Sequence, residues 1–222
     1  MTGMDDPAPQ PTDRRPNPRV AIGLTGGIAA GKTTVANMLA ARGAVLVDSD
    51  VVAREVVEPG SQGLAGIVGR FGAHVLAADG FLDRAALGRI VFADPRARAD
   101  LEAITHPLIR RRTAELVADA PADAVVVQVI PLLAETGQAH RFDEVVVVDA
   151  TPDEQVARLV ARQGISVDAA RARLAAQVSR EERLAMATRV VDNTDAAADL
   201  GGQVDRLWDD LCELVRSRHV GQ

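Results

Sequence analysis

The stretch Gly26-Gly27-Ile28-Ala29-Ala30-Gly31-Lys32-Thr33 decides the fold, because it has the spacing G-x-x-x-x-G-K-[ST] of a phosphate-binding loop. Gly26 and Gly31 let the backbone turn tightly, so that successive N–H groups point at phosphate oxygens in front of a helix N-terminus. Lys32 is the single lysine of the chain, against 24 arginines. In this motif the lysine reaches the β- and γ-phosphates, and the hydroxyl of Thr33 ligates Mg²⁺. The motif predicts a site for ATP and Mg²⁺.

Valine- and isoleucine-rich runs alternate with helical patterns around this loop. Such alternation indicates an α/β fold, with a parallel β-sheet covered by helices on both faces. The predicted strands are 19–24, 44–47, 124–130, 144–149 and 189–191. The predicted helices are 32–42, a helix-rich stretch over 61–119, and 153–163, 166–187 and 196–217. The sequence therefore predicts a P-loop kinase type of core.

Two helical, charged stretches interrupt the alternation at places where strands end. They are 51–119 and 163–187, and ligands bind at such strand ends in parallel sheets. We expect a substrate domain over 51–119 and a lid over about 163–187, inserted in a nucleotide-binding core made of 19–50 and 120–218. Residues 1–18 carry five prolines and few apolar residues, which predicts a disordered tail.

Composition limits the class of protein. The chain has 222 residues, of which 47% are hydrophobic and 25% charged, as in a soluble globular protein. Its net charge of −6 argues against nonspecific binding to nucleic acid and favours small-molecule partners. One cysteine, Cys212, allows no intrachain disulfide and fits a reducing cytoplasm. No membrane-spanning run or signal peptide is visible, so we expect a cytoplasmic protein, either a monomer or a small homo-oligomer.

A second group of chemical residues is Asp48-Ser49-Asp50, directly after the predicted strand 44–47. If the extended geometry continues, strand alternation points Asp48 and Asp50 to the same side, beside the phosphate loop. Asp48 would then hold Mg²⁺ or its water, and Asp50 would accept a proton from an attacking hydroxyl. The alternative is that both acids cap the following helix, since aspartate favours that position.

Arg158 and Arg162 lie four residues apart on the predicted helix 153–163. Two like charges at this spacing are mildly destabilising unless an anion lies near them, and a guanidinium there would stabilise a migrating phosphoryl group. The alternative is that both face solvent. Arg54, one turn beyond Asp50, could hold anionic groups of a substrate or pair with Glu58.

Three further motifs lie near the expected catalytic edge. His106-Pro107 predicts the start of a helix whose arginines at 110–112 suit a phosphate-rich substrate or form a solvated face. The run 131–135, PLLAE, follows a predicted strand and would shape the substrate pocket. Within the predicted lid, polar residues on a helical stretch could close over ATP and exclude water. They are Arg171, Arg173, Gln177 and Arg180.

Several motifs in one order resemble the dephospho-coenzyme A kinase family. They are GLTGGIAAGKT, VDSDVVAREVVEPG, LEAITHPLIRRR, IPLLAE, VVVVDATPDEQVARLVAR and VVDN. The resemblance extends from Arg19 to about Leu214. It implies ATP-dependent phosphorylation of the ribose 3′-hydroxyl of dephospho-coenzyme A, the last step of coenzyme A synthesis. It also implies that 51–119 is a coenzyme-binding helical domain.

The resemblance assigns roles residue by residue. It makes Asp50 the general base, Lys32 the phosphate-loop lysine and Arg158 an arginine at the transferring phosphate. The expected nucleotide contacts are Gly27, Ala29, Ala30, Gly31, Lys32, Thr33, Thr34, Arg162 and, near the adenine, Asn193. The expected contacts of the acceptor are Arg54, His106, Arg110 and Leu132. The expected metal ligands are Thr33 and Asp48.

The chain departs from the family pattern at four positions. Ala29 and Ala30 stand where a glycine and a small polar residue are usual, and a methyl group there limits the backbone conformations of the loop. Thr188 and Asp195 replace an aspartate and a glycine on the adenine side.

Two other classes of protein share the loop. A different small-molecule kinase needs neither the HPLI nor the PLLAE motif. A regulatory NTPase would act as a switch, but a guanine-binding Asn-Lys-x-Asp motif is impossible here because the only lysine is already in the loop.

Overall fold

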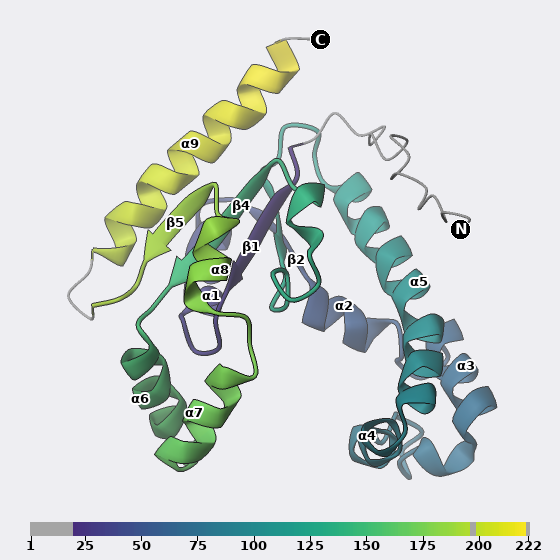
Figure 1. Ribbon diagram of the computed structural model, residues 1–222. Coiled ribbons are helices and arrows are strands. Elements are labelled where there is room, and N and C mark those ends of the chain that lie inside the picture. Colours follow the sequence, from purple (N-terminus) through teal and green to yellow (C-terminus); the bar gives the residue numbers. More distant parts are fainter. Residues whose placement is uncertain (1–19, 196–198, 221–222) are drawn as a thin grey trace, which may run out of the picture.

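The computed structural model describes residues 20–195 and 199–220, and its centre is a five-stranded β-sheet (Figure 1). The strand order is β2-β3-β1-β4-β5, and every neighbouring pair is parallel. The strands are β1 (Ile22–Gly26), β2 (Val45–Asp48), β3 (Val126–Val129), β4 (Glu144–Asp149) and β5 (Arg189–Asp192). The predicted parallel α/β fold is confirmed.

The core on one face of the sheet lies under α1 (Lys32–Ala41) and α9 (Leu200–Val220). Strand side chains such as Leu24 and Val127 are fully buried there against Leu39 of α1 and Leu211 of α9. Because β1 is covered on both faces, every one of its residues is buried, as continuous apolar runs predict for central parallel strands.

The other face of the sheet is covered by α5 (Pro95–Asp119), by α8 (Arg180–Ala185) and by the loop after β3, which contains the short 3₁₀ helix η2 (Gln138–Arg141). Val126 packs under α5, and Val145 and Val147 pack under α8 and the loop.

Two groups of helices extend from the sheet as separate arms (Figure 1). One arm consists of α6 (Pro152–Gln163) and α7 (Val167–Ala175), which lead on to α8. The other consists of α2 (Ser49–Glu55), α3 (Gln62–Phe71), η1 (Ala73–Val75), α4 (Arg84–Ala93) and α5. The second arm has its own small core, in which Ile67, Phe71, Val75 and Leu87 are buried.

The predicted start of a helix at His106-Pro107 is wrong, because α5 runs from Pro95 to Asp119 through Pro107. Its start is fixed by Asp94, whose carboxylate accepts the N–H of Arg96 at 2.8 Å. Proline inside a helix removes one backbone hydrogen bond. Packing on both sides outweighs that loss, since Ile104 packs into the core of the helical arm and Ile109 packs onto the sheet.

Two expectations concern residues that the structure does not describe. The predicted tail 1–18 lies entirely outside the described residues, and the helix predicted over 196–217 begins outside them, its described part being α9. Within the described residues, no helix combines the length and the apolar character that a membrane span needs.

Candidate active site

The phosphate loop connects β1 directly to α1, as the motif predicts. Gly31 has a φ of 103°, and a Cβ atom added there would lie 2.4 Å from Nδ2 of Asn193. A Cβ atom on Gly26 would lie 2.6 Å from the carbonyl oxygen of Val148. Gly31 is therefore required by its backbone conformation and by a close neighbour, and Gly26 is required by the close backbone neighbour alone.

Three carboxamide side chains hold the backbone of this loop in place. Gln177 accepts the N–H of Ile28 at 2.8 Å, and Gln155 donates to the carbonyl of Ile28 at 2.7 Å. Asn193 donates to the carbonyl of Ala30 at 2.7 Å. Because these side chains come from α6, from the α7–α8 connection and from the residue after β5, the loop is tied to three distant parts of the chain.

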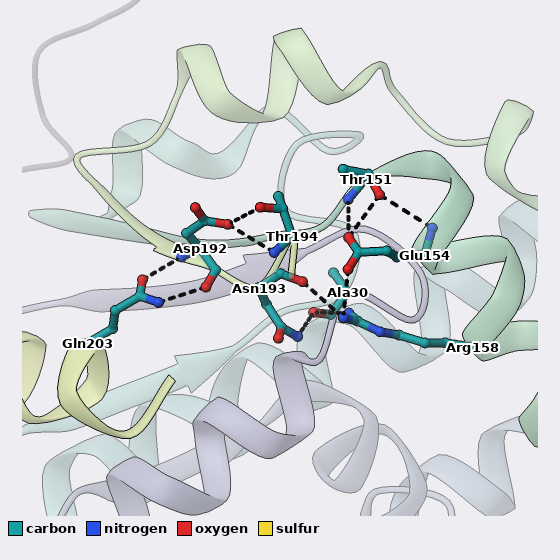
Figure 2. A network of polar contacts seen from close by, with 8 residues as sticks. All are labelled: Ala30, Thr151, Glu154, Arg158, Asp192, Asn193, Thr194 and Gln203. Atoms are coloured by element: carbon teal, nitrogen blue, oxygen red, sulfur yellow. Dashed lines mark hydrogen bonds and ion pairs between the residues drawn. The ribbon is translucent and has the colours of Figure 1, made fainter. Parts of the chain in front are cut away.

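Asn193 is itself held firmly, as Figure 2 shows. The preceding residue, Asp192, exchanges two backbone hydrogen bonds of 2.8 Å with the side chain of Gln203 on α9. The carboxylate of Asp192 also accepts the backbone N–H of Thr194 at 2.9 Å. The resemblance places Asn193 near the adenine, but the structure shows its amide bonded to the phosphate loop.

Arg158 is part of the same network (Figure 2). Its guanidinium donates to the carbonyl of Asn193 at 2.9 Å and to the carbonyl of Ala30 at 3.4 Å. Glu154, one turn earlier on α6, lies 3.5 Å from the guanidinium and also closes a capping box with Thr151. Arg158 is therefore a half-buried, oriented side chain, and the alternative of a solvent-facing residue is wrong for it.

A cavity of about 530 Å³ lies over the loop and brings together most of the predicted catalytic and nucleotide-binding residues. The phosphate loop from Gly26 to Thr34 forms one wall. The predicted side chains that line it are Lys32, Thr33, Thr34, Asp48, Asp50, Arg158 and Arg162. Both carboxylates and both arginines therefore face the space in front of the phosphate loop.

The electrostatics of this cavity are centred on Lys32. Burial lowers the pKa of its ammonium, whereas the nearby charges of Asp50, Asp48 and Glu135 act in the opposite direction and raise it. One carboxylate oxygen of Glu135 is buried and has no hydrogen-bond partner among the described residues. A half-buried ammonium interacts strongly with a nearby phosphate, because the surrounding protein screens charge less than water does.

Asp48 and Asp50 reach the cavity by a different geometry from the predicted one. The strand ends at Asp48 and α2 begins at Ser49, so the extended alternation does not continue to Asp50. Asp48 caps the helix and accepts the N–H of Asp50 at 2.8 Å, as the alternative interpretation predicted for this residue. Asp50, in the first turn of α2, is exposed and free to face a ligand.

The residues predicted to bind the acceptor are only partly brought together. His106 and Arg110 line a second cavity, of about 650 Å³, whereas Arg54 and the exposed Leu132 line neither of the two cavities. Arg54 and Glu58, both within the described part of the chain, form no ion pair with each other.

The residues predicted to close over ATP also differ in their placement. Gln177 lines the nucleotide cavity, whereas Arg180 forms a bidentate ion pair with Asp149 at 2.6 and 2.9 Å. Arg173 bonds to Gln163, and Arg171 is exposed. None of the three arginines lines the nucleotide cavity, and the ion pair of Arg180 ties α8 to the end of β4.

Sequence reasoning missed two buried polar residues beside the loop. Gln155 is 2% exposed and Arg183 is 9% exposed, and a Cβ atom on Gly27 would collide with Gln155 and crowd Arg183. One feature of the sequence could have indicated Gln155. It precedes Arg158 by three residues and therefore lies on the same face of the helix.

Ala29 carries backbone strain, because it is the non-glycine residue with a positive φ, 57°, in the described ranges. Replacing Ala29 with glycine should raise the free energy of unfolding by about 0.5–1 kcal/mol. Glycine removes the cost of a left-handed alanine, which is about 1–2 kcal/mol. Part of this stabilisation is offset, because glycine makes the unfolded chain more flexible and so increases the entropy lost on folding. Thermal unfolding without nucleotide measures the change.

Ala30→Gly is the matched control for Ala29→Gly. Ala30 is buried and does not have a positive φ, so glycine there removes packing without relieving strain and should lower the melting temperature. Equal destabilisation by both variants would show that Ala29 is not strained.

The protein family and the relatives that match this chain are kinases, as the phosphate loop and its cavity indicate. The family model of dephospho-CoA kinase matches residues 20–199. A dephospho-CoA kinase of Streptomyces avermitilis is 54% identical over 190 residues, which cover 86% of this chain and 93% of the relative. A dephospho-CoA kinase of Thermobifida fusca is 47% identical over 197 residues, with 89% and 98% covered.

Solved structures give the same result. The crystal structure of TT1252 from Thermus thermophilus matches with a TM-score of 0.73 at 34% identity, covering 87% of this chain and 98% of that one. Dephospho-CoA kinase from Campylobacter jejuni matches with a TM-score of 0.66 at 28% identity, covering 87% and 97%. A phosphate loop, two facing aspartates and an oriented arginine in one cavity, together with these matches, show that the chain belongs to the dephospho-CoA kinase family.

Proposed function

We propose that the chain transfers the γ-phosphoryl group of ATP to the ribose 3′-hydroxyl of dephospho-CoA, giving coenzyme A and ADP. The observation that carries the proposal is the convergence of Lys32, Asp50 and Arg158 on one cavity above the phosphate loop, in a chain of the dephospho-CoA kinase family. The cytoplasm is the proposed location, since a single cysteine fits a reducing compartment.

Asp50 would act as the general base. As the 3′-oxygen forms its bond to the γ-phosphorus, the hydroxyl proton passes to the Asp50 carboxylate, and the bond to the β–γ bridging oxygen breaks. The position of Asp50 supports this role, because the carboxylate is exposed at the cavity and its backbone is fixed by Asp48.

Lys32 and Arg158 would stabilise the negative charge of the phosphates. Arg158 is held by two backbone carbonyls before any ligand binds, so it would need little reorganisation when charge develops on the phosphoryl oxygens. Arg162 and the N–H groups of the loop would complete the phosphate contacts.

Mg²⁺ would be held by the hydroxyl of Thr33 and by Asp48. The cap on α2 uses Oδ1 of Asp48, and no hydrogen bond to its Oδ2 is present among the described residues, so that oxygen is left to face the cavity. Hard oxygen donors of this kind suit Mg²⁺, which binds to one or two protein oxygens together with substrate phosphates. When bound, the ion would neutralise phosphate charge.

The two helical arms would bind different substrates. The arm formed by α2 to α5, within 51–119, would bind the coenzyme, and α7 and α8, within 163–187, would form the lid over ATP. The bond between Gln177 and the N–H of Ile28 supports the second role, because it joins this segment to the phosphate loop.

A direct assay tests the function. Purified protein is incubated with ATP, Mg²⁺ and dephospho-CoA, and mass spectrometry follows whether the acceptor gains one phosphoryl group. We expect coenzyme A to form. Binding of ATP without any product from dephospho-CoA would overturn the acceptor and favour a different small-molecule kinase or a nucleotide-dependent switch.

A further inference from the structure

The second cavity is a groove on the face of the sheet opposite to α1. Its floor is formed by β3 and by Val20 and Ala21 just before β1, one wall by α5, and the other wall by the loop after β3, including Phe142. Its volume of about 650 Å³ exceeds that of the nucleotide cavity. The groove is thus large enough for a substantial part of a substrate.

The groove begins at the active site. Ser49 lines it, while the residues on both sides of Ser49, which are Asp48 and Asp50, line the nucleotide cavity. Along β3, likewise, Gln128 and Ile130 face the groove and Val129 faces the nucleotide cavity. A ligand whose reacting hydroxyl lies at Asp50 can therefore continue into the groove.

The side chains on one face of α5 change in polarity along the groove. His106, Arg110, Thr113 and Val117 are spaced by four, three and four residues, and all four line the groove over about 16 Å of helix. Since α5 runs antiparallel to β3 and ends just before it, His106 lies toward the active site and Val117 toward the far end. The wall therefore changes from basic to polar to apolar.

Gln128 is the unexpected residue of the floor. Strand alternation places Val126, Gln128 and Ile130 on the groove side, and Gln128 interrupts an otherwise apolar strand. Its half-buried carboxamide has no hydrogen-bond partner among the described residues. An unpaired amide at this place is suited to bond a polar group in the middle of a mostly apolar ligand.

We infer that this groove binds the diphosphate and the pantetheine arm of the acceptor, and that Gln128 hydrogen-bonds an amide of the arm. The inference rests on the proposed function for the identity of the acceptor. The chemical order agrees, because the diphosphate adjoins the ribose and would meet His106 and Arg110, whereas the arm beyond it alternates apolar groups and two amides. Arg110 has no ion-pair partner among the described residues, which leaves its charge for the diphosphate.

Binding of an arm fragment tests the inference without turnover. Calorimetry with pantetheine 4′-phosphate and the full chain, in the absence of ATP, should show binding to the wild type. Gln128→Leu should raise the Kd about tenfold, and the KM for dephospho-CoA by a similar factor, as expected for one lost hydrogen bond, while the KM for ATP stays unchanged.

If Gln128→Leu folds poorly, a second variant and a control still test whether the groove binds the fragment. Ala114→Trp adds bulk from the exposed side of α5 into the groove and should abolish binding of the fragment while ADP still binds. Glu213→Leu, at an exposed position of α9 outside both cavities, should change neither constant.

The outcomes separate the groove from the function. Fragment binding that depends on Gln128, in a protein that does not phosphorylate dephospho-CoA, would support the groove and overturn the acceptor. Phosphorylation of dephospho-CoA with no fragment binding, or with constants that neither groove variant changes, would overturn the groove alone. A loss of ADP affinity as large as the loss of fragment affinity would also overturn it.

Discussion

Asp50→Asn is expected to lower kcat for phosphoryl transfer about 10²–10⁴-fold, because an amide cannot accept the proton of the attacking hydroxyl. The substitution keeps the size and shape of the side chain, and the N–H of residue 50 that bonds to Asp48 stays in place. The KM for ATP should change little, since the phosphate loop is untouched. Steady-state kinetics with dephospho-CoA and ATP measure both quantities.

The matched control for this variant is Asp153→Asn. Asp153 is an exposed carboxylate at the second position of α6, as Asp50 is at the second position of α2, so both lose the same favourable interaction with a helix N-terminus. Asp153→Asn should retain full activity. Undiminished product from Asp50→Asn would remove Asp50 as the base and leave positioning and charge as the sources of catalysis.

Arg158→Gln is expected to lower kcat about 10²–10³-fold, the usual loss when one oriented donor to a developing charge is removed. The variant also removes the hydrogen bonds to Ala30 and Asn193, so the KM for ATP should rise as the phosphate loop loses one of its supports. Arg158→Lys should recover only part of the activity, because an ammonium keeps the charge but not the planar fork that bonds two carbonyls.

Arg189→Gln controls for the loss of a half-buried ion pair. The side chain of Arg189 is 37% exposed, against 32% for Arg158, and it pairs with Glu144 and Asp210 away from both cavities. Removal of the Arg189 ion pairs should lower the melting temperature and leave kcat unchanged. If both arginine variants lower activity only in proportion to their loss of folded protein, Arg158 has no role at the transferring phosphate.

The fold was predictable where local pattern is sufficient. A run of β-branched residues such as 144–149, EVVVVD, favours a buried parallel strand, and the structure has β4 over that range. The phosphate loop was also predictable from the sequence, because its glycines and Lys32 act through local backbone geometry.

The errors arose where local signals conflict. Proline marks a helix start in many contexts, but Pro107 lies inside α5, since helix packing on two separate cores exceeds the cost of one missing hydrogen bond. The spacing of Asp48 and Asp50 fits both an extended chain and a helix start, and only the cap formed by Asp48 distinguishes them.

The supports of the loop were not predictable from pattern. Gln155, Gln177 and Asn193 bond to loop residues that lie 127, 149 and 163 positions away in the sequence. No period or motif encodes such contacts, because they depend on how the sheet brings its strand ends together.

The solitary Lys32 has a chemical consequence for the whole molecule. Every other basic side chain that stays charged near neutral pH is an arginine, so the chain offers amine-directed reagents one ε-amino group, and that group lies inside the nucleotide cavity. Burial lowers its pKa and so increases the neutral, nucleophilic fraction at a given pH. Acylation at a single side chain would therefore report whether the phosphate site is open or filled.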